Sequence, residues 1–268
     1  MHLSGDESLL RLIAIPGMRL FLVPPQPCAM EVRLDAAFEL PDCRWLHAFT
    51  IADGEVPCRF GVSAEGAYYY TFGSQGLLRY REGQGVDISP LHSVPTLRFA
   101  LWTAYAMMGM GLGALPVHSS VAVCGGKAVM CLGESGTGKS THTRLWIEHI
   151  VGTTLLNDDS PVVAVHPDGV RVYGSPWGGK TPWFLTESYP IAGLVRLEQQ
   201  TENRIRRLNT AESVAALLPS CPPSLACEEH CLDLLADFVG KVISTVPVYR
   251  LGCRPDAEAA QLVYRTIM

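Results

Sequence analysis

The sequence predicts an α/β fold in which a mixed, bent sheet carries a phosphate-binding loop and follows a β-rich N-terminal lobe. The stretch GESGTGKST at residues 133–141 fits the pattern G-x-x-x-x-G-K-S/T and lies between a strand-like and a helix-like run. Over the first 95 residues, short aromatic and β-branched runs alternate with glycine, proline and aspartate turns. We therefore expect a β-rich lobe at residues 1–95 and a phosphate-loop domain at residues 96–268.

Composition favours a well-packed globular chain. Hydrophobic residues make up 48% and charged residues 18% of the 268 positions. The formal net charge of -5 lacks the basic footprint of a nucleic-acid-binding protein. Nine cysteines beside a phosphate loop favour a reducing cytoplasm over a disulfide framework, and the acidic opening MHLSGDESLL is unlike a signal peptide. We expect a cytoplasmic protein that binds no nucleic acid, and homo-oligomerisation stays open.

One uncharged stretch, residues 99–117, just reaches the length of a transmembrane helix. Gly109, Gly111, Gly113 and Pro116 interrupt it, and it leads directly into the strands around the phosphate loop. A buried core helix followed by a turn explains the stretch better, so we expect no membrane partner.

Cysteine and histidine gather in CPPSLACEEHC, at Cys221, Cys227, His230 and Cys231. The spacing lacks the paired C-x-x-C elements of common structural zinc sites. Thiols on a partly buried helix are the alternative to a zinc site.

The elements of the N-terminal lobe are expected to be strands. Six runs are short and aromatic or β-branched and end at turn residues: RLFLVP (19–24), EVRL (31–34), CRWLHAFTI (43–51), RFGVS (59–63), AYYYTF (67–72) and LLRYRE (77–82).

The second part begins with an apolar helix near residues 96–113 and then alternates strands and helices. Hairpins follow the phosphate loop, which makes the sheet mixed rather than purely βαβ. The expected elements are the strand KAVMCLG, a hairpin PVVAV-HPDG-VRVYG, a pair GLVRLEQ and RIRRL across QTEN, a helix TAESVAALL capped by Asn209 with Glu212, a helix at about 224–243, the strand PVYRLGC, and a last helix capped by Asp256.

The phosphate loop itself is expected to bind Mg²⁺-ATP. A strand, a glycine loop and a helix aim a helix N-terminus, with its partial positive charge, at an anion. Lys139 would reach the β- and γ-phosphates, and the Ser140 hydroxyl would bind Mg²⁺. The alternative is a glycine-rich turn with a surface lysine, but the chain has only four lysines against seventeen arginines. The expected nucleotide-binding residues are Gly133, Glu134, Ser135, Gly136, Thr137, Gly138, Lys139, Ser140 and Thr141.

Two carboxylates follow the loop in LLNDDSPVV, at the end of an apolar strand. Asp158 and Asp159 could hold Mg²⁺ or accept the proton of an attacking hydroxyl. The alternative is a turn, because Asp-Asp-Ser-Pro is good turn chemistry. Adjacent strand residues point in different directions, so we expect two different roles.

Read together, PVHSSVAV, GESGTGKST and LLNDDSPVV resemble the HPr serine kinase family, which shares its fold with ATP-dependent phosphoenolpyruvate carboxykinase. The ending VPVYRLGCRPDAEAA is also similar, so the resemblance covers roughly residues 96–268. In the family a histidine precedes the loop, and the histidine and the aspartates sit at the reaction centre. A lone His118 is more often structural, but the resemblance implies a catalytic role for it. It also suggests a base near His118, and we assign Asp158 as base and Asp159 as metal ligand.

The chain departs from that family at several points. HPr kinases usually carry glutamate after the loop serine, where this chain has Thr141. No counterpart of the arginine-containing signature of bifunctional HPr kinase/phosphorylases is present, and the N-terminal part is different. The chain also has no room for the extra substrate-binding domain of carboxykinases.

The resemblance implies an ATP-dependent kinase that transfers the γ-phosphoryl group to a hydroxyl, with serine of a peptide, protein or small molecule as acceptor. A non-catalytic ATP-binding regulatory module is the alternative from another class. A carboxykinase-type lyase is a third. The sequence does not name the acceptor.

The stretch GSPWGGK, residues 174–180, is expected to return to the reaction centre because it follows a strand paired with the one leaving the Asp pair. Its glycines, Trp177 and Lys180, together with Trp183, suit a lid that closes over the acceptor, with Lys180 as a cation for the phosphoryl group. A surface loop with a solvated lysine is the alternative.

Overall fold

The computed structural model describes residues 1–74, 76–179 and 183–268. Its contacts divide the chain into two compact units, Met1–Leu112 with Ser224–Leu234, and Gly113–Pro223 with Leu235–Met268. The fold is mixed α/β with a β-rich N-terminal part, which confirms the predicted fold class. The domain boundary at residue 95 stays a prediction, and the contacts group helix α2, Val94–Met110, with the first unit.

The first unit is built on one mixed sheet of seven strands in the order β1-β2-β7-β6-β5-β4-β3. β2 pairs in parallel with β1 and with β7, and the other neighbours are antiparallel. The strands are β1 His2–Ser4, β2 Glu31–Arg33, β3 Cys43–Ile51, β4 Val56–Ser63, β5 Tyr68–Phe72, β6 Gly76–Arg81 and β7 Gly85–Ile88.

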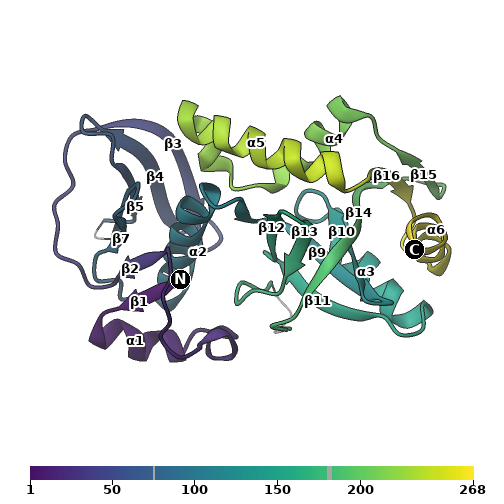
Figure 1. Ribbon diagram of the computed structural model, residues 1–268, viewed down its shortest axis with the longest axis horizontal. Coiled ribbons are helices and arrows are strands. Elements are labelled where there is room, and N and C mark those ends of the chain that lie inside the picture. Colours follow the sequence, from purple (N-terminus) through teal and green to yellow (C-terminus); the bar gives the residue numbers. More distant parts are fainter. Residues whose placement is uncertain (75, 180–182) are drawn as a thin grey trace. The chain divides into compact units, whose positions relative to one another are not determined.

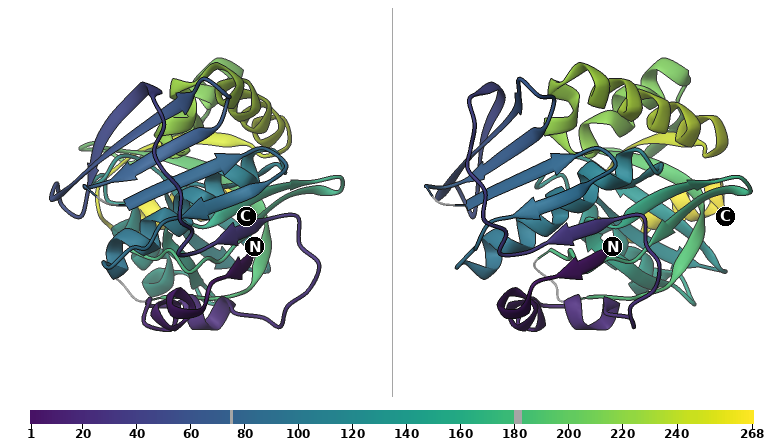
Figure 2. Two further views of the ribbon diagram at one scale, coloured as in Figure 1. Left: turned by 90° about the vertical axis from the view of Figure 1, so that its left-hand side faces the viewer. Right: turned by 60° about the vertical axis from the view of Figure 1, so that its left-hand side comes forward.

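Five of the six strands expected here are present, and the one at residues 19–24 is wrong. That run holds the end of a 3-10 helix, η1 Met18–Phe21, and then irregular chain. Leu20, Leu22 and Val23 are exposed, so the run has no apolar face to bury in a sheet. Helix α1, Asp6–Ile13, was not predicted and lies beside β1 (Figures 1 and 2).

Helix α2 is the expected core helix. Ser93 caps it by accepting a hydrogen bond from the backbone N–H of Thr96, and the helix packs against β6 and β7. Leu101 and Met107 on it are completely buried. Among the described residues, no helix is both long and apolar enough to cross a bilayer.

The second unit contains a mixed sheet of nine strands. Seven follow the order β11-β9-β10-β14-β13-β12-β8, and β16 pairs with β14 and with β15. Helices α3 and α6 pack against each other, and Trp146, Leu197 and Val263 are part of the core cluster there (Figure 1). The elements from residue 114 onward are β8 Ala114–Pro116, β9 Ser119–Cys124, β10 Lys127–Leu132, α3 Lys139–His149, β11 Thr154–Asp159, β12 Val162–His166, β13 Gly169–Tyr173, β14 Ser188–Gln199, β15 Arg204–Arg207, α4 Thr210–Leu217, α5 Glu229–Thr245, β16 Val248–Cys253 and α6 Ala257–Ile267, with 3-10 helices η2 Leu218–Ser220 and η3 Pro223–Cys227. Of these, η3 after Pro223 and α5 up to Leu234 belong to the first unit.

Strand pairing after the loop is partly as predicted. The hairpin of β12 and β13 is confirmed, with Val162 opposite Tyr173. The expected hairpin of GLVRLEQ and RIRRL is wrong, because β16 lies between those strands, parallel to β14 and antiparallel to β15. The four-residue connection QTEN is short enough for a hairpin of β14 and β15. Instead, β14 pairs in parallel with β16, and the local sequence does not reveal this partner.

The predicted helix caps are confirmed. Asn209 and Glu212 form a capping box at α4, and the Asp256 side chain accepts from the Ala259 N–H at the start of α6. The boundary between the two units falls within α5, after Leu234.

The cysteine cluster does not form a metal site in the described structure. Within residues 1–74, 76–179 and 183–268, no three His, Cys, Asp or Glu side chains gather closely enough to hold a metal ion. Cys221 and Cys231 are buried, and burial raises the pKa of each thiol to about 12. Cys227 is exposed. Cys227 is the last residue of η3, and Cys231 lies in the first turn of α5.

His142 makes the stability of the fold depend on pH. It lies on α3, only 3% exposed, and its Nε2 accepts a hydrogen bond from Trp146 Nε1 at 3.2 Å. Burial lowers the pKa of His142 from 6.5 to about 4. The His142 imidazole therefore takes up a proton near pH 6.5 in the unfolded chain but only near pH 4 in the folded protein. The free energy of unfolding should fall as the pH drops through this window, by about 3 kcal/mol from this group.

The variant His142→Gln tests this, because its amide oxygen can still accept from Trp146 but does not titrate. Urea unfolding followed by circular dichroism at several pH values between 6.5 and 4 should show a shallower loss of stability in the variant. Equal pH dependence in both proteins would contradict the assignment.

Candidate active site

The phosphate loop, residues 133–141, joins β10 to α3 as predicted. Gly138 caps the helix with φ 100°, a left-handed conformation that glycine adopts without steric cost, and α3 begins at Lys139. Glu134, Ser135 and Gly136 are exposed at the tip of the loop. The loop therefore presents backbone N–H groups and a helix N-terminus to an anion.

Lys139 lies inside the loop. The residue is 8% exposed, and its Nζ donates to the backbone oxygens of Gly133 at 2.8 Å and Glu134 at 3.1 Å. Burial lowers the pKa of Lys139, and the carboxylates of Asp159, Asp158 and Glu134 oppose that effect. The ammonium group is thus held at the site by the loop itself and is surrounded by carboxylates.

Ser140 and Asp158 are joined directly. The Ser140 hydroxyl, at the start of α3, donates to Asp158 Oδ1 at 2.9 Å. Asp158 is the penultimate residue of β11 and is 9% exposed. This contact links the phosphate loop to the acidic pair.

His118 and Asp159 lie together beside the loop because of the strand register. β9 lies between β10 and β11, and Ser119 is opposite both Leu132 and Asp159. His118 immediately precedes Ser119, and its Nε2 lies 3.8 Å from Asp159 Oδ1. Both side chains are partly open to solvent, 42% and 43% exposed.

His118 is poised to be neutral. Its backbone N–H donates to the Ser220 oxygen at 2.7 Å. Burial lowers the pKa of His118 below its usual value, and the charge of Lys139 lowers it further. A neutral imidazole can accept or donate a hydrogen bond to Asp159 without forming an ion pair.

Asp159 has an unusual backbone. Its φ of 149° is in a region that non-glycine residues rarely occupy, and such strain gathers at functional sites. Asp159 forms an isolated antiparallel bridge with Gly178. The next residue, Gly179, donates its N–H to the Asp158 oxygen at 2.6 Å, and a Cβ there would lie 2.8 Å from the same oxygen.

The segment 174–179 therefore returns to the acidic pair, as the hairpin predicted. Trp177 is buried and Trp183 is 46% exposed. Lys180, the proposed cation of the lid, lies outside the described residues, so its role stays a prediction.

A buried amide supports this arrangement. Asn157 is completely buried on β11, and its Nδ2 donates to the oxygen and the hydroxyl of Ser175 at 3.1 Å each. Its Oδ1 accepts from the Ser160 N–H at 3.2 Å. Asn157 thus ties the strand that carries the acidic pair to the returning segment.

The remaining predicted loop residues shape the loop. Thr137 donates through its N–H and its hydroxyl to the Glu134 oxygen, at 3.2 and 2.8 Å. Thr141 lies half-buried in the first turn of α3.

Sequence reasoning missed two residues of β14 that contact the loop. Arg196 Nη2 lies 2.7 Å from Glu134 Oε1, and Gln199 Nε2 donates to the Gly136 oxygen at 3.3 Å. β14 runs parallel to β10 and places Arg196 opposite Leu132, the last strand residue before the loop. An arginine in the middle of the apolar run GLVRLE was the signal that could have found it.

The oxygen donors present fit Mg²⁺ as a companion of a nucleotide. Mg²⁺ is usually held by one or two carboxylates together with phosphate oxygens and water, not by an all-protein cage. The Ser140 hydroxyl and the Asp158 carboxylate already lie within 2.9 Å of each other.

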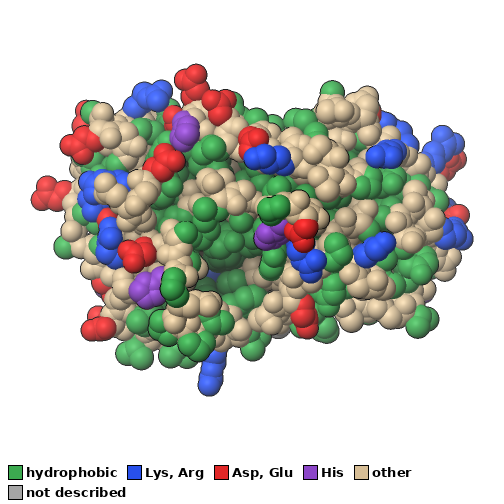
Figure 3. Space-filling view, in the orientation of Figure 1, with side chains coloured by type: hydrophobic (Ala, Val, Ile, Leu, Met, Phe, Trp, Pro, Cys, Tyr) green, Lys and Arg blue, Asp and Glu red, His purple; other side chains and the backbone are tan. Residues whose placement is uncertain are grey.

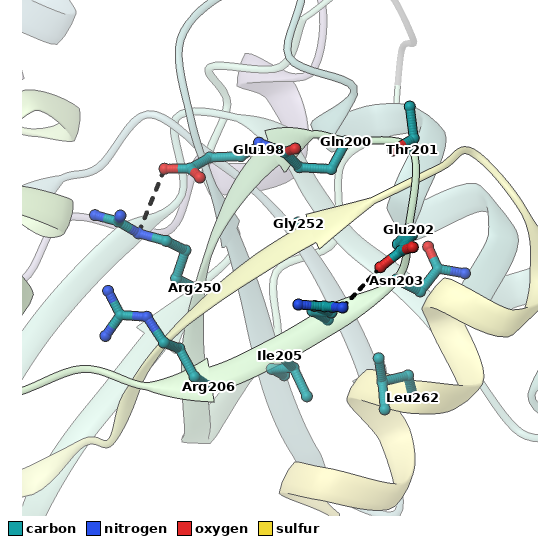
Figure 4. Close-up of a pocket in the computed structure, with 11 residues that line it drawn as sticks. Glu198, Gln200, Thr201, Glu202, Asn203, Ile205, Arg206, Arg250, Gly252 and Leu262 are labelled. Carbon is teal, nitrogen blue, oxygen red and sulfur yellow. Dashed lines mark ion pairs between the residues drawn. The ribbon is translucent and has the colours of Figure 1, made fainter.

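A separate cleft of 620 Å³ on the second unit does not contain the predicted residues (Figure 4). Four of its charged groups are paired with each other, with Arg250 Nε 3.3 Å from Glu198 Oε1 and Arg204 Nη2 2.9 Å from Glu202 Oε2, and Arg206 pairs with Glu212 outside the lining. Its lining is Glu198, Gln200, Thr201, Glu202, Asn203, Arg204, Ile205, Arg206, Arg250, Gly252 and Leu262.

No family model matches the chain, and no curated protein matches it. Among solved structures, the chain is similar to the Hpr(Ser) kinase/phosphatase from Coxiella burnetii, with 10% sequence identity and a TM-score of 0.35. The alignment covers 56% of this chain and 94% of that one. A TM-score this low indicates nothing about the residues, ligands or activity of this chain.

Proposed function

We propose that this protein is an ATP-dependent kinase that transfers the γ-phosphoryl group to a hydroxyl, with a serine of a peptide, protein or small molecule as acceptor. The observation that supports this most is the hydrogen bond from Ser140 to Asp158, since it joins a phosphate loop to a carboxylate. His118 and Asp159 lie next to that contact and reach solvent.

Binding and transfer would be divided among the residues as follows. The loop N–H groups and the Lys139 ammonium would hold the phosphates and offset the charge that develops on the transferred group. Ser140 and Asp158 would hold Mg²⁺, which when bound neutralises phosphate charge.

The acceptor would approach from the exposed side of Asp159. The Asp159 carboxylate would take the hydroxyl proton while the acceptor oxygen bonds to the γ-phosphorus and the bond to the β-phosphate oxygen breaks, releasing ADP. His118, neutral because of its lowered pKa, would orient Asp159 or the acceptor hydroxyl through a hydrogen bond. This assignment reverses the one made from sequence, because Asp158 is the carboxylate that accepts the hydrogen bond of the loop serine, whereas Asp159 lies beside His118.

Two other functions compete with this proposal. A nucleotide-binding regulatory module would need the loop but not a strained, solvent-facing carboxylate beside a histidine. A carboxykinase-type lyase would need an additional substrate-binding domain. A kinase mechanism would use the phosphate loop, both aspartates and His118, which the described residues bring together.

The proposal is tested with purified protein, ATP labelled on the γ-phosphate, Mg²⁺ and a cell lysate as the source of acceptors. We expect label on serine hydroxyls, identified by mass spectrometry, with Asp159→Asn as the inactive control. ATP binding without transfer to any lysate fraction would favour the regulatory module, and absence of ATP binding would contradict both.

A further inference from the structure

The position of Arg196 is energetically unfavourable for an arginine, because its charged side chain is largely removed from water. Arg196 is in the middle of β14 between Val195 and Leu197, which are part of the apolar core, and its side chain is only 18% exposed. Arginine is seldom buried without partners, since its charge loses hydration. Its Nη1 is buried and has no hydrogen-bond partner among the described residues. An ordinary surface ion pair would not need this burial.

Among the residues that the structure describes, Arg196 donates a hydrogen bond to a carboxylate of the phosphate loop. Nη2 donates to Glu134 Oε1 at 2.7 Å. The hydrogen bond from Arg196 is the main reason that the pKa of Glu134 is lowered, and the charge of Lys139 adds to the effect. The Glu134 carboxylate is therefore ionised and close to the groups that would face the nucleotide.

A charge count shows what this pair does. The described charged groups around the loop are two cations, Lys139 and Arg196, and three carboxylates, of Glu134, Asp158 and Asp159. Their sum is -1, and it would be -2 without Arg196. A polyphosphate carries several negative charges, so each uncompensated carboxylate near it weakens binding.

The neighbouring arginines provide a comparison. Arg250 is opposite Arg196 on β16, and Arg206 is opposite Arg250 on β15. Each pairs with a carboxylate away from the loop, Arg250 with Glu198 at 3.3 Å and Arg206 with Glu212 at 2.6 Å. They are more exposed than Arg196, at 39% and 50%. Of these three arginines, Arg196 is the one whose carboxylate lies in the phosphate loop.

We propose that Arg196 is a positioning residue that cancels the charge of Glu134 and so makes the phosphate loop able to accept a polyphosphate. The proposal rests on the proposed ATP-binding function. The role of Arg196 is electrostatic, because Arg196 acts through Glu134 and does not itself touch the phosphates. Losing Arg196 therefore matters only while Glu134 keeps its charge.

The test is a double-mutant cycle on the full chain, read by calorimetric titration with Mg²⁺-ATP. Arg196→Gln should weaken binding about tenfold or more, which corresponds to about 1.4 kcal/mol. Glu134→Gln should bind Mg²⁺-ATP more tightly than the wild type, because it removes a negative charge from the loop while Arg196 keeps its positive charge. The double variant should return to within about threefold of the wild type, because it removes both charges together. Arg196→Lys, which keeps the charge, should keep most of the affinity.

Two further readouts separate an electrostatic role from a merely structural one. The defect of Arg196→Gln should shrink at high salt, because salt screens the repulsion from Glu134. The matched control Arg250→Gln, on the adjacent strand, should bind like the wild type. Thermal unfolding of every variant checks that the fold is retained.

Several outcomes would overturn the proposal. If the double variant stays as weak as Arg196→Gln, Arg196 acts on the phosphates or on the fold and not through Glu134. If Arg196→Gln binds normally while the wild type binds ATP, this inference fails and the proposed function stands. If the wild type binds no nucleotide, the proposed function fails, and this inference with it.

Discussion

Replacing Lys139 with alanine should lower phosphoryl transfer by about 10²–10³-fold, the usual effect of removing a preorganised group that stabilises charge in a transition state. The ammonium is held by the Gly133 and Glu134 oxygens, so it is already positioned before a phosphate arrives. The defect should appear in both the turnover rate and the nucleotide affinity, because the lysine reaches phosphates in the ground state as well. Steady-state rates with labelled ATP and calorimetric titration measure the two effects.

Lys127→Ala is the matched control. Lys127 is exposed at the start of β10, at the opposite end of that strand from the loop. The Lys127→Ala substitution removes the same charge from the same strand–loop–helix segment but leaves the site unchanged. Normal turnover and normal affinity in Lys139→Ala would contradict the assignment of the loop as the phosphate site. Equal losses in the two variants would show that the effect is one of overall charge.

Local chemistry explains which parts of the fold could be predicted. The strand before the phosphate loop, the helix after it and the caps at Asn209 and Asp256 all depend on neighbouring residues, and the structure has them. The apolar run at residues 19–24 was misinterpreted because apolar character alone does not provide a partner strand. Side chains there are exposed instead of packed.

Longer-range pairing explains what could not be predicted. β16 is inserted between β14 and β15, and no local pattern in the connection QTEN indicates that a strand from residues 248–253 will lie there. The partner of Arg196 could not be predicted from local sequence either, because Glu134 is 62 residues away in the chain. The contact of Ser140 with Asp158 depends on the same kind of register, yet motif spacing predicted that these residues would share a site.

Replacing Asp158 or Asp159 with asparagine should impair activity in two different ways. Comparing the two variants is the most discriminating test of the site. Asp158→Asn should mainly raise the Mg²⁺ concentration needed for half-maximal activity, because Asp158 is the carboxylate bonded to Ser140. Asp159→Asn should bind Mg²⁺-ATP nearly normally but lose turnover by about 10²–10⁴-fold, the usual contribution of a general base.

The structural reason for this division is the orientation of adjacent strand residues. Asp158 points toward the loop and is largely buried, whereas Asp159 points toward His118 and is 43% exposed. His118→Asn should reproduce part of the Asp159 defect with little change in Mg²⁺ dependence. Mg²⁺ titrations at saturating ATP, together with single-turnover rates, separate the two roles. Identical defects in Asp158→Asn and Asp159→Asn would refute the division, and a metal defect confined to Asp159→Asn would restore the assignment made from sequence.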